Sequence, residues 1–226
     1  MMRPIPLKNE RLVTLLSTLT DICYTPTVMQ YAAKFKSRRD DLIPEHYGVS
    51  DEYLRTALTK KITDFGFPRT SLGMGMNGVP TDRIDIIDPI EKQVKKVGKF
   101  LGTHVNALTM IYPDKGFIGW HHNGNAPGYN ILMSYSQDGD GDFRYYDKKE
   151  DKIVVLNDKP GWFVKVGYYP SERSETERIY WHAAQTKKQR VSVAWIINHR
   201  PMWLSMIEEI TGGDYDKEFI ESQGNQ

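Results

Sequence analysis

The chain of 226 residues is long enough to bury the core of one domain with an appended helical layer. Its 30 basic and 29 acidic residues nearly balance, which excludes a chain-wide basic field for binding polyanions but is compatible with a local basic groove. Cys23 is the single cysteine, and neither a signal peptide nor an apolar run long enough for a membrane span is visible, so we expect a cytoplasmic protein without disulfides and without a membrane partner.

The first hundred residues have the spacing of helices. Apolar residues recur at helical intervals from Leu12 to Ile22. Ser50 has the character of an N-cap ahead of a second helical pattern, which we expect to end at Gly66.

A stretch rich in Gly, Pro and Met, residues 66–83, has no periodicity and is predicted to be either a plain connector or a substrate lid. Asp88, Pro89 and Glu91 then form the pattern of a helix start, with Asp88 as N-cap and Pro89 in the first position. An apolar stripe follows, and Gly102 is expected to end that helix.

After Gly102 the pattern changes to short segments with the character of strands, separated by turn-like clusters. There are eight such segments: residues 104–112, 117–123, 129–136, 142–146, 152–156, 162–166, 178–184 and 190–197. An antiparallel sandwich or barrel is therefore predicted. A last helix is expected from near Pro201 to Gly212.

Alternation along the strands divides the polar candidates between two faces. In the last two strands the apolar face is suited to pack under the N-terminal helices, so the polar face looks into the mouth of the barrel. This pattern allows five polar side chains to converge in one cavity: His121, Asn123, His182, Arg190 and Ser192. His122 points the other way and is expected to be a packing or surface histidine.

An arginine in a partly dry cavity needs an anionic partner, because an unpaired buried charge is costly. Arg190 has no acidic residue on its own strand. One interpretation is a bound carboxylate ligand, with Ser192 as an additional donor. The other is an ion pair with an acidic residue elsewhere, which is favoured when Arg190 is considered alone.

The order "WHHN … H … RVS" on successive strands resembles the iron(II)/2-oxoglutarate-dependent dioxygenases, whose motif is His-x-Asp/Glu … His … Arg-x-Ser on a double-stranded β-helix. The surrounding segments "LTMIYPDKGFIGWH", "DGDGDFRYYD" and "VVLNDKPGWFVKVG" resemble the same family. The resemblance covers roughly residues 104–198, and within the family it is greatest to oxygenase-like proteins of tailed bacteriophages.

The resemblance implies an α+β, mainly β fold with a jelly-roll or cupin-like double-stranded β-helix. Residues 104–198 would form this oxygenase core, residues 1–103 an N-terminal layer of helices and loop, and residues 199–226 a C-terminal helix and tail, all in one integrated domain.

The same resemblance implies the cofactors iron(II), 2-oxoglutarate and O2. His121 and His182 would be iron ligands, with Asn123 in the third position of the motif. Arg190 would bind the distal carboxylate of 2-oxoglutarate, helped by Ser192 and Tyr112.

Asn123 departs from the family, which has a carboxylate at this position. An amide oxygen is neutral and a weaker donor, so the affinity for iron should fall. Several outcomes stay open: ligation by Asn123, chloride in a vacant position, a shifted register that pairs His122 with Gly124, a ligand from Asp138, Asp140 or Asp142, or loss of catalysis.

The function implied is hydroxylation of a C–H bond in a macromolecular substrate, either protein or nucleic acid, in the cytoplasm (that of the host, if the protein is viral). The alternative is a non-catalytic double-stranded β-helix that binds a partner and has a degenerate metal site. Two basic clusters are compatible with nucleic acid or with ordinary solvated helix faces: Lys34, Lys36, Arg38 and Arg39, and Lys95, Lys96 and Lys99. The sequence indicates no oligomeric state.

Overall fold

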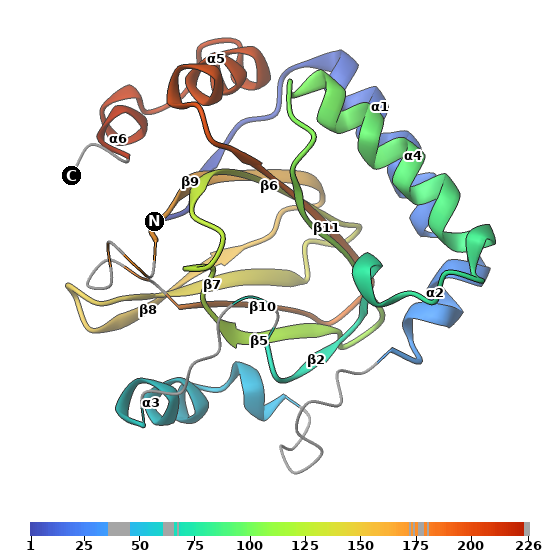
Figure 1. The fold of residues 1–226 in the computed structure, drawn as a ribbon, viewed down its shortest axis with the longest axis horizontal. Helices are drawn as coiled ribbons and strands as arrows, with labels where there is room; N and C mark the ends of the chain where they lie inside the picture. Colours follow the sequence, from blue (N-terminus) through green and yellow to red (C-terminus); the bar gives the residue numbers. More distant parts are fainter. Residues whose placement is uncertain are drawn as a thin grey trace.

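The computed structural model describes residues 1–35, 46–60, 66, 68–171, 173, 175, 179 and 181–223. Within these residues, two antiparallel sheets face each other (Figure 1). The first contains, in spatial order, β1 (Arg3–Ile5), β9 (Gly161–Tyr169), β6 (Gly128–Ser136), β11 (Arg190–Ile197), β4 (Asn106–Tyr112) and β3 (Met74–Gly75). The second contains β2 (Ser71–Leu72), β5 (Phe117–His121), β10 (His182–Thr186), β7 (Gly141–Asp147) and β8 (Lys152–Asn157).

The strands from β4 to β11 follow the connectivity of a double-stranded β-helix. The chain crosses between the sheets from β4 to β5, β5 to β6 and β6 to β7, makes a hairpin from β7 to β8, and then crosses again at each step to β11. This arrangement pairs β4 with β11 and β5 with β10, so the first and last strands of the core are neighbours in both sheets. The predicted α+β jelly-roll fold is confirmed.

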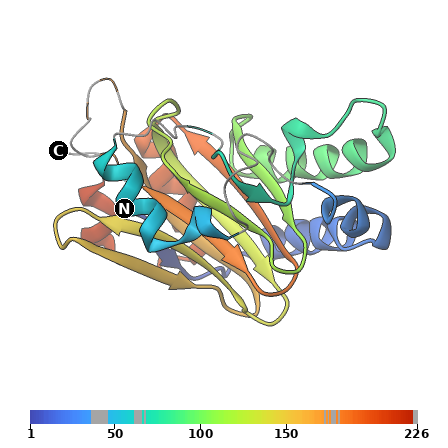
Figure 2. The ribbon, with the colours of Figure 1, turned by 90° about the horizontal axis from the view of Figure 1, so that it is seen from below.

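Helices cover the outer face of the first sheet (Figures 1 and 2). They are α1 (Glu10–Cys23), α2 (Pro26–Ala32), α4 (Ile84–Phe100) and α5 (Arg200–Thr211), with α6 (Lys217–Ser222) beyond them. Val191, Val193 and Trp195 of β11 are buried in one cluster with Leu12 and Leu16 of α1. The prediction that the apolar face of this strand packs under helices is therefore confirmed, and its other face is left for the interior of the barrel.

The second sheet has a smaller outer layer, formed by the short helix η1 (Tyr47–Val49) and by α3 (Asp51–Thr59). Ser50 caps α3, since its side chain accepts a hydrogen bond from the backbone N–H of Tyr53. Tyr53 and Leu54 pack with Trp120 of β5 and with Trp181. This cluster fixes the outer side of the strand that ends at His121.

Two predicted helix boundaries are wrong. The helix that begins after Ser50 ends at Thr59 rather than at Gly66. The helix expected to start at Asp88 begins one turn earlier, at Ile84, and Pro89 lies inside it. Burial of Ile86 in the core favours this additional turn, and Asp88 accepts a hydrogen bond from Lys92 at 2.6 Å instead of capping the helix.

The stretch of residues 66–83 contributes an edge strand to each sheet. β2 pairs with β5 and β3 pairs with β4, and Gly73 between them has a φ of 149°. The short helix η2 (Met76–Gly78) follows. The described part of this predicted connector or lid is thus attached to the sheets on both sides of the barrel.

Among the described residues, no single helix is long and apolar enough to cross a membrane. Of the helices that the structure describes, α1 and α2 taken together meet that criterion of length and composition, and these two helices are bent by 71° relative to each other.

Candidate metal and carboxylate site

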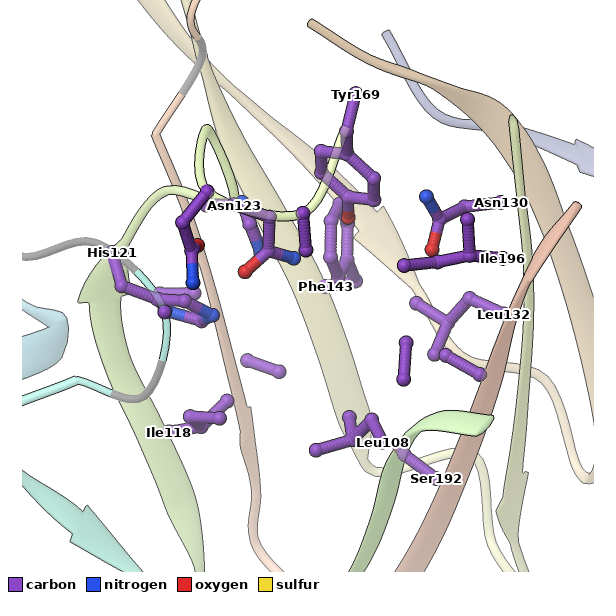
Figure 3. Close-up of a pocket in the computed structure, with 18 of the residues that line it drawn as sticks. Leu108, Ile118, His121, Asn123, Asn130, Leu132, Phe143, Tyr169, Ser192 and Ile196 are labelled. Atoms are coloured by element: carbon purple, nitrogen blue, oxygen red, sulfur yellow. The ribbon is translucent and has the colours of Figure 1, made fainter. Parts of the chain in front are cut away.

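A cavity of about 380 Å³ opens between the two sheets. All six residues predicted for the site line it, and they come from β4, β5, β10, β11 and the turn after β5: Tyr112, His121, Asn123, His182, Arg190 and Ser192. Figure 3 shows His121 and Asn123 on one side of the cavity, opposite Asn130, Leu132 and Ile196 of the first sheet.

His121 is oriented by a local irregularity in β5. His182 pairs with His121, but Ala184, two residues further along β10, pairs with Ile118, so β5 contains an extra residue between the two pairs. The carbonyl oxygen of Gly119, within this bulge, lies 2.8 Å from Nδ1 of His121. If Nδ1 carries the proton, this contact leaves Nε2 as the lone-pair donor.

The backbone of β5 approaches its neighbours closely at the bulge. The N–H of Gly119 donates to the carbonyl of Thr70 at 2.9 Å, and a Cβ at Gly119 would lie 2.7 Å from Oγ1 of Thr70. A side chain at position 119 would therefore force this close backbone approach apart.

His182 lies beside His121 at the start of β10. The two ring centroids are 4.2 Å apart and the rings are inclined by 54°. Phe143 stacks on His182 with a centroid distance of 5.5 Å, and Tyr169 packs against it at 5.1 Å. Aromatic packing therefore restricts the orientation of this imidazole.

Asn123 reaches the same two imidazoles from the turn after β5, rather than from the strand predicted to extend to residue 123. Its Nδ2 lies 3.5 Å from Nε2 of His182. Because the oxygen and nitrogen of an amide are assigned from their surroundings, a rotation of the amide group would place Oδ1 there instead.

His122 and the two neighbouring tryptophans lie on the opposite side of the strands. The ring of His122 packs edge-on against Trp181 at 5.2 Å, and its Nδ1 accepts from the N–H of Gly124 at 3.3 Å. Trp120 is fully buried and donates to the carbonyl of Ser50. His122 is therefore a packing histidine, and a shifted register that pairs it with Gly124 finds no support.

Arg190 lines the cavity and is buried among polar partners, with 1% of its side chain exposed. It donates from Nε to Asp158 at 2.5 Å, from Nη1 to Ser192 at 2.7 Å and from Nη2 to Ser134 at 3.0 Å. The ring of Tyr112 lies beside the guanidinium, 5.3 Å from its Cζ to the ring centroid. The ion pair with an acidic residue elsewhere in the chain is thus present.

A second cation shares the same carboxylate. Lys165 of β9 donates from Nζ to Oδ1 of Asp158 at 3.0 Å, and the two side chains are 0% and 1% exposed. Burial raises the pKa of Asp158, but the attraction of Arg190 and Lys165 outweighs it and lowers this pKa to about 2. Burial also lowers the pKa of Lys165 to about 8, against the attraction of Asp158.

Sequence reasoning missed Asp158, Lys165 and Ser134. Asp158 and Lys165 both occur in the segment "VVLNDKPGWFVKVG", which carries part of the family resemblance. Asp158 follows β8 in a turn with Lys, Pro and Gly, where an aspartate is ordinary, and its contact with Arg190 spans 32 positions. The signal that could have identified Lys165 was the presence of a lysine in an otherwise apolar strand.

The other acidic residues proposed as ligands lie elsewhere. Asp138 and Asp140 are exposed in the turn between β6 and β7. Asp142 accepts from Arg144 at 2.6 Å and from Gln185 at 3.1 Å. Across the described residues, no group of three His, Cys, Asp or Glu side chains that could hold a metal ion is found.

Only part of the two predicted basic clusters lies among the described residues. Lys36, Arg38 and Arg39 lie outside the described residues. On α4, Lys95 forms an ion pair with Glu91 at 3.0 Å, so part of the charge of this cluster is neutralised.

Solved structures similar to this chain include several iron(II)/2-oxoglutarate oxygenases. A prolyl-4-hydroxylase from Pseudomonas putida is 12% identical, covers 81% of this chain and 98% of its own, and has a TM-score of 0.31. An oxidoreductase of the 2OG-Fe(II) oxygenase family from Burkholderia pseudomallei is 16% identical over 60% and 62% of the two chains, with a TM-score of 0.29. The dioxygenase for auxin oxidation from Arabidopsis thaliana, in its 2-oxoglutarate complex, is 13% identical over 85% and 80%, with a TM-score of 0.33.

No protein-family profile and no curated protein sequence matches the chain. The chain is thus similar to oxygenases of known structure, at low identity, and the chemistry of its site rests on its own residues. The narrower resemblance to bacteriophage proteins stays a prediction.

Proposed function

We propose that this protein is an iron(II)- and 2-oxoglutarate-dependent oxygenase that hydroxylates a C–H bond. One observation carries the proposal: a pair of inward imidazoles and a buried arginine that can bind a carboxylate line the same cavity of about 380 Å³. Imidazole nitrogen and amide oxygen are donors for iron(II), whereas the arginine and its hydroxyl neighbours suit an organic anion. 2-Oxoglutarate has the chemistry to contact both.

The donor set fits iron(II). The contact between Nδ1 of His121 and the carbonyl of Gly119 favours the tautomer whose Nε2 binds metal. The proximity of His121 and His182 places two such nitrogens together, and Asn123 would add a neutral amide oxygen. Without a protein carboxylate, the site is expected to bind iron more weakly than the usual motif.

The carboxylate end of the cavity fits an anion. Arg190 and Lys165 together carry two positive charges against the one negative charge of Asp158. Ser192 and Tyr112 add hydroxyl groups near Arg190. A ligand carboxylate would compensate the remaining charge and accept hydrogen bonds from these residues.

When bound, iron(II) would supply the activation of O2 that couples oxidative decarboxylation of 2-oxoglutarate to oxidation of the substrate. The residues of this chain bind and orient the reactants. Apolar side chains exclude water from the space between the two polar ends of the cavity: Leu108, Ile118, Leu132, Phe143 and Ile196.

The substrate group that enters the cavity is proposed to be uncharged. Among the described residues that line the cavity, Arg190 is the only lysine, arginine or acidic side chain, and it lies at the cosubstrate end. Asn130, on the wall opposite the histidines, donates from Nδ2 to the carbonyl of Gly128 at 3.2 Å. Its amide oxygen is then available to accept a hydrogen bond from a substrate group. A neutral side chain or base of a macromolecule meets this requirement.

The proposal is tested by measuring anaerobic binding of iron(II) and 2-oxoglutarate to the wild-type protein and to Arg190→Ala. The wild type should bind 2-oxoglutarate in the presence of iron(II) and form succinate when O2 is admitted. Arg190→Ala should lose at least about 2 kcal/mol of cosubstrate binding, as expected for a removed charge partner. Ser136→Ala, a substitution on the same buried sheet that does not line the cavity, is the control.

Equal cosubstrate binding by wild type and Arg190→Ala contradicts this function, and so does the absence of binding by both. A folded protein that binds neither reactant would instead support the non-catalytic binding module.

A further inference from the structure

The carboxylate of Asp158 lies between two cations, Arg190 and Lys165. One oxygen accepts from Arg190 at 2.5 Å and the other accepts from Lys165 at 3.0 Å. All three side chains are at most 1% exposed. Since buried charges are costly without compensation, a further negative charge beside this cluster would be favourable.

We propose that Lys165 is a positioning residue that controls the affinity of the cavity for the distal carboxylate of 2-oxoglutarate. This inference rests on the proposed function. Lys165 does not line the cavity; it acts through Asp158. With Lys165 protonated, the cluster has one net positive charge near Arg190. When Lys165 is neutral, Asp158 cancels Arg190, and the attraction for an incoming carboxylate is lost.

The surroundings of Lys165 make its charge responsive to pH. Burial lowers the pKa of Lys165 to about 8. Asp158 stabilises the ammonium, Arg190 opposes it, and Asp142 of β7 contributes a weaker attraction while paired with Arg144. Lys165 also lies beside the ring of Phe163, with the ring centroid 4.3 Å from Nζ, and pairs in register with Pro4 of β1 and Leu132 of β6.

The affinity for 2-oxoglutarate should fall with rising pH, because binding of its carboxylate requires the positive charge of Lys165. Below the pKa of Lys165 the cluster carries its extra charge and binds the carboxylate. As the pH rises through about 8, the ammonium loses its proton and the dissociation constant of 2-oxoglutarate increases. Arg190 retains its charge throughout this range.

The test is anaerobic calorimetric titration of 2-oxoglutarate into the iron(II)-loaded protein, from about pH 6.5 to about pH 9.5. Wild type is compared with Lys165→Met and with the double variant Lys165→Met/Asp158→Asn, in which Arg190 keeps an uncompensated charge. Arg83→Met, which removes an ion-paired cation at the start of α4, is the control. 2-Oxobutanoate, a 2-oxo acid without the distal carboxylate, is the control ligand.

Lys165→Met should bind 2-oxoglutarate at least about tenfold more weakly than wild type at neutral pH and lose the decrease in affinity near the pKa of Lys165. The double variant should recover most of the affinity, without that pH dependence. Arg83→Met should retain the wild-type profile, and binding of 2-oxobutanoate should be the same in wild type and Lys165→Met.

Binding by Lys165→Met with the wild-type dissociation constant and pH profile overturns the role of Lys165 but leaves the proposed function intact. A double variant that binds no better than the folded single variant also overturns it, because a purely structural lysine would not be rescued by removing a charge. If wild type itself binds no 2-oxoglutarate, the proposed function fails and this inference fails with it.

Discussion

Under the proposed function, Asn123 would decide how strongly the two histidines hold a metal ion. Its amide lies 3.5 Å from the imidazole of His182, so the side chain is within reach of any ion bound there. The amide is neutral, so only its oxygen dipole is available to attract the ion. A carboxylate at this position would add a full negative charge without a change of side-chain length.

The substitution Asn123→Asp should therefore raise the affinity for iron(II) by at least about tenfold, because an anionic oxygen replaces a neutral one. Anaerobic titration with iron(II) measures the dissociation constant. Asn125→Asp places the same charge at the exposed mouth of the cavity and is the control. Equal effects of the two substitutions would show that position 123 does not contact the metal.

Asp158 links the site to the acid stability of the protein. Its pKa of about 2 lies below the ordinary value of 3.8, so the folded state binds the proton less tightly than the unfolded state. This contribution to stability is fully present above the unfolded pKa and is lost as the pH falls toward the folded pKa. A shift of this size corresponds to about 2 kcal/mol.

We expect Asp158→Asn to lower the free energy of unfolding at neutral pH by about 3–5 kcal/mol, since Arg190 and Lys165 lose their shared partner. Between the two pKa values, the stability of the variant should depend less on pH than that of wild type. Urea unfolding at several pH values measures both effects. Asp85→Asn, which removes an exposed ion pair with Arg83, should change stability much less; an equal loss would contradict the role of Asp158.

At the scale of the element, close backbone contacts position the site. The bulge of β5 turns His121 inward, and the start of β7 lies against the buried ion pair. A Cβ at Gly141 would be 2.5 Å from Oδ2 of Asp158 and 3.1 Å from Nε of Arg190. The N–H of Asp158 also donates to the carbonyl of Gly141 at 2.8 Å. Absence of a side chain at Gly141 therefore allows the ion pair to form beside β7.

Gly141→Ala should destabilise the fold by about 1–3 kcal/mol through overpacking and should weaken 2-oxoglutarate binding, because Asp158 and Arg190 must move. Gly78→Ala, where the nearest atom to the new Cβ would be Cε1 of Phe35 at 3.7 Å, is the control. Thermal unfolding and cosubstrate titration are the measurements. Unchanged binding by Gly141→Ala would mean that the geometry of the ion pair does not affect the ligand.

At the scale of the whole molecule, the two sheets connect ligand binding to stability. The histidines belong to the second sheet and Arg190 to the first. A ligand that contacts iron at one end and Arg190 at the other therefore bridges the sheets. Such a ligand stabilises the folded protein by mass action.

Iron(II) and 2-oxoglutarate together should raise the unfolding temperature of wild type under anaerobic conditions, with about 2.7 kcal/mol of stabilisation at a ligand concentration 100-fold above its dissociation constant. 2-Oxobutanoate at the same concentration should stabilise less, since it cannot reach Arg190. Equal shifts with the two ligands would indicate that the distal carboxylate makes no contact with the first sheet.

The residue pattern by itself predicted an antiparallel sandwich or barrel and the inward residues of its last strand, and the family resemblance implied the double-stranded β-helix. Side chains alternate between the two faces of a strand, so Arg190 and Ser192 of β11 lie on the face opposite Val191 and Val193. Assigning these residues to a face therefore needs no knowledge of tertiary contacts. The family resemblance implied that His121 and His182 lie together, which strand alternation allowed but did not require. Helix ends were less predictable, because burial of Ile86 in the core overrode the signal of Pro89.

Only the tertiary structure revealed which charged residues surround Arg190. The partner of Arg190 lies 32 positions away in a turn, and no spacing rule connects an arginine to a carboxylate across a barrel. The bulge in β5 is likewise visible only in the pairing of His182 with His121 and of Ala184 with Ile118. Local periodicity specifies which face a side chain occupies, whereas electrostatic partners depend on which loops and strands the fold brings together.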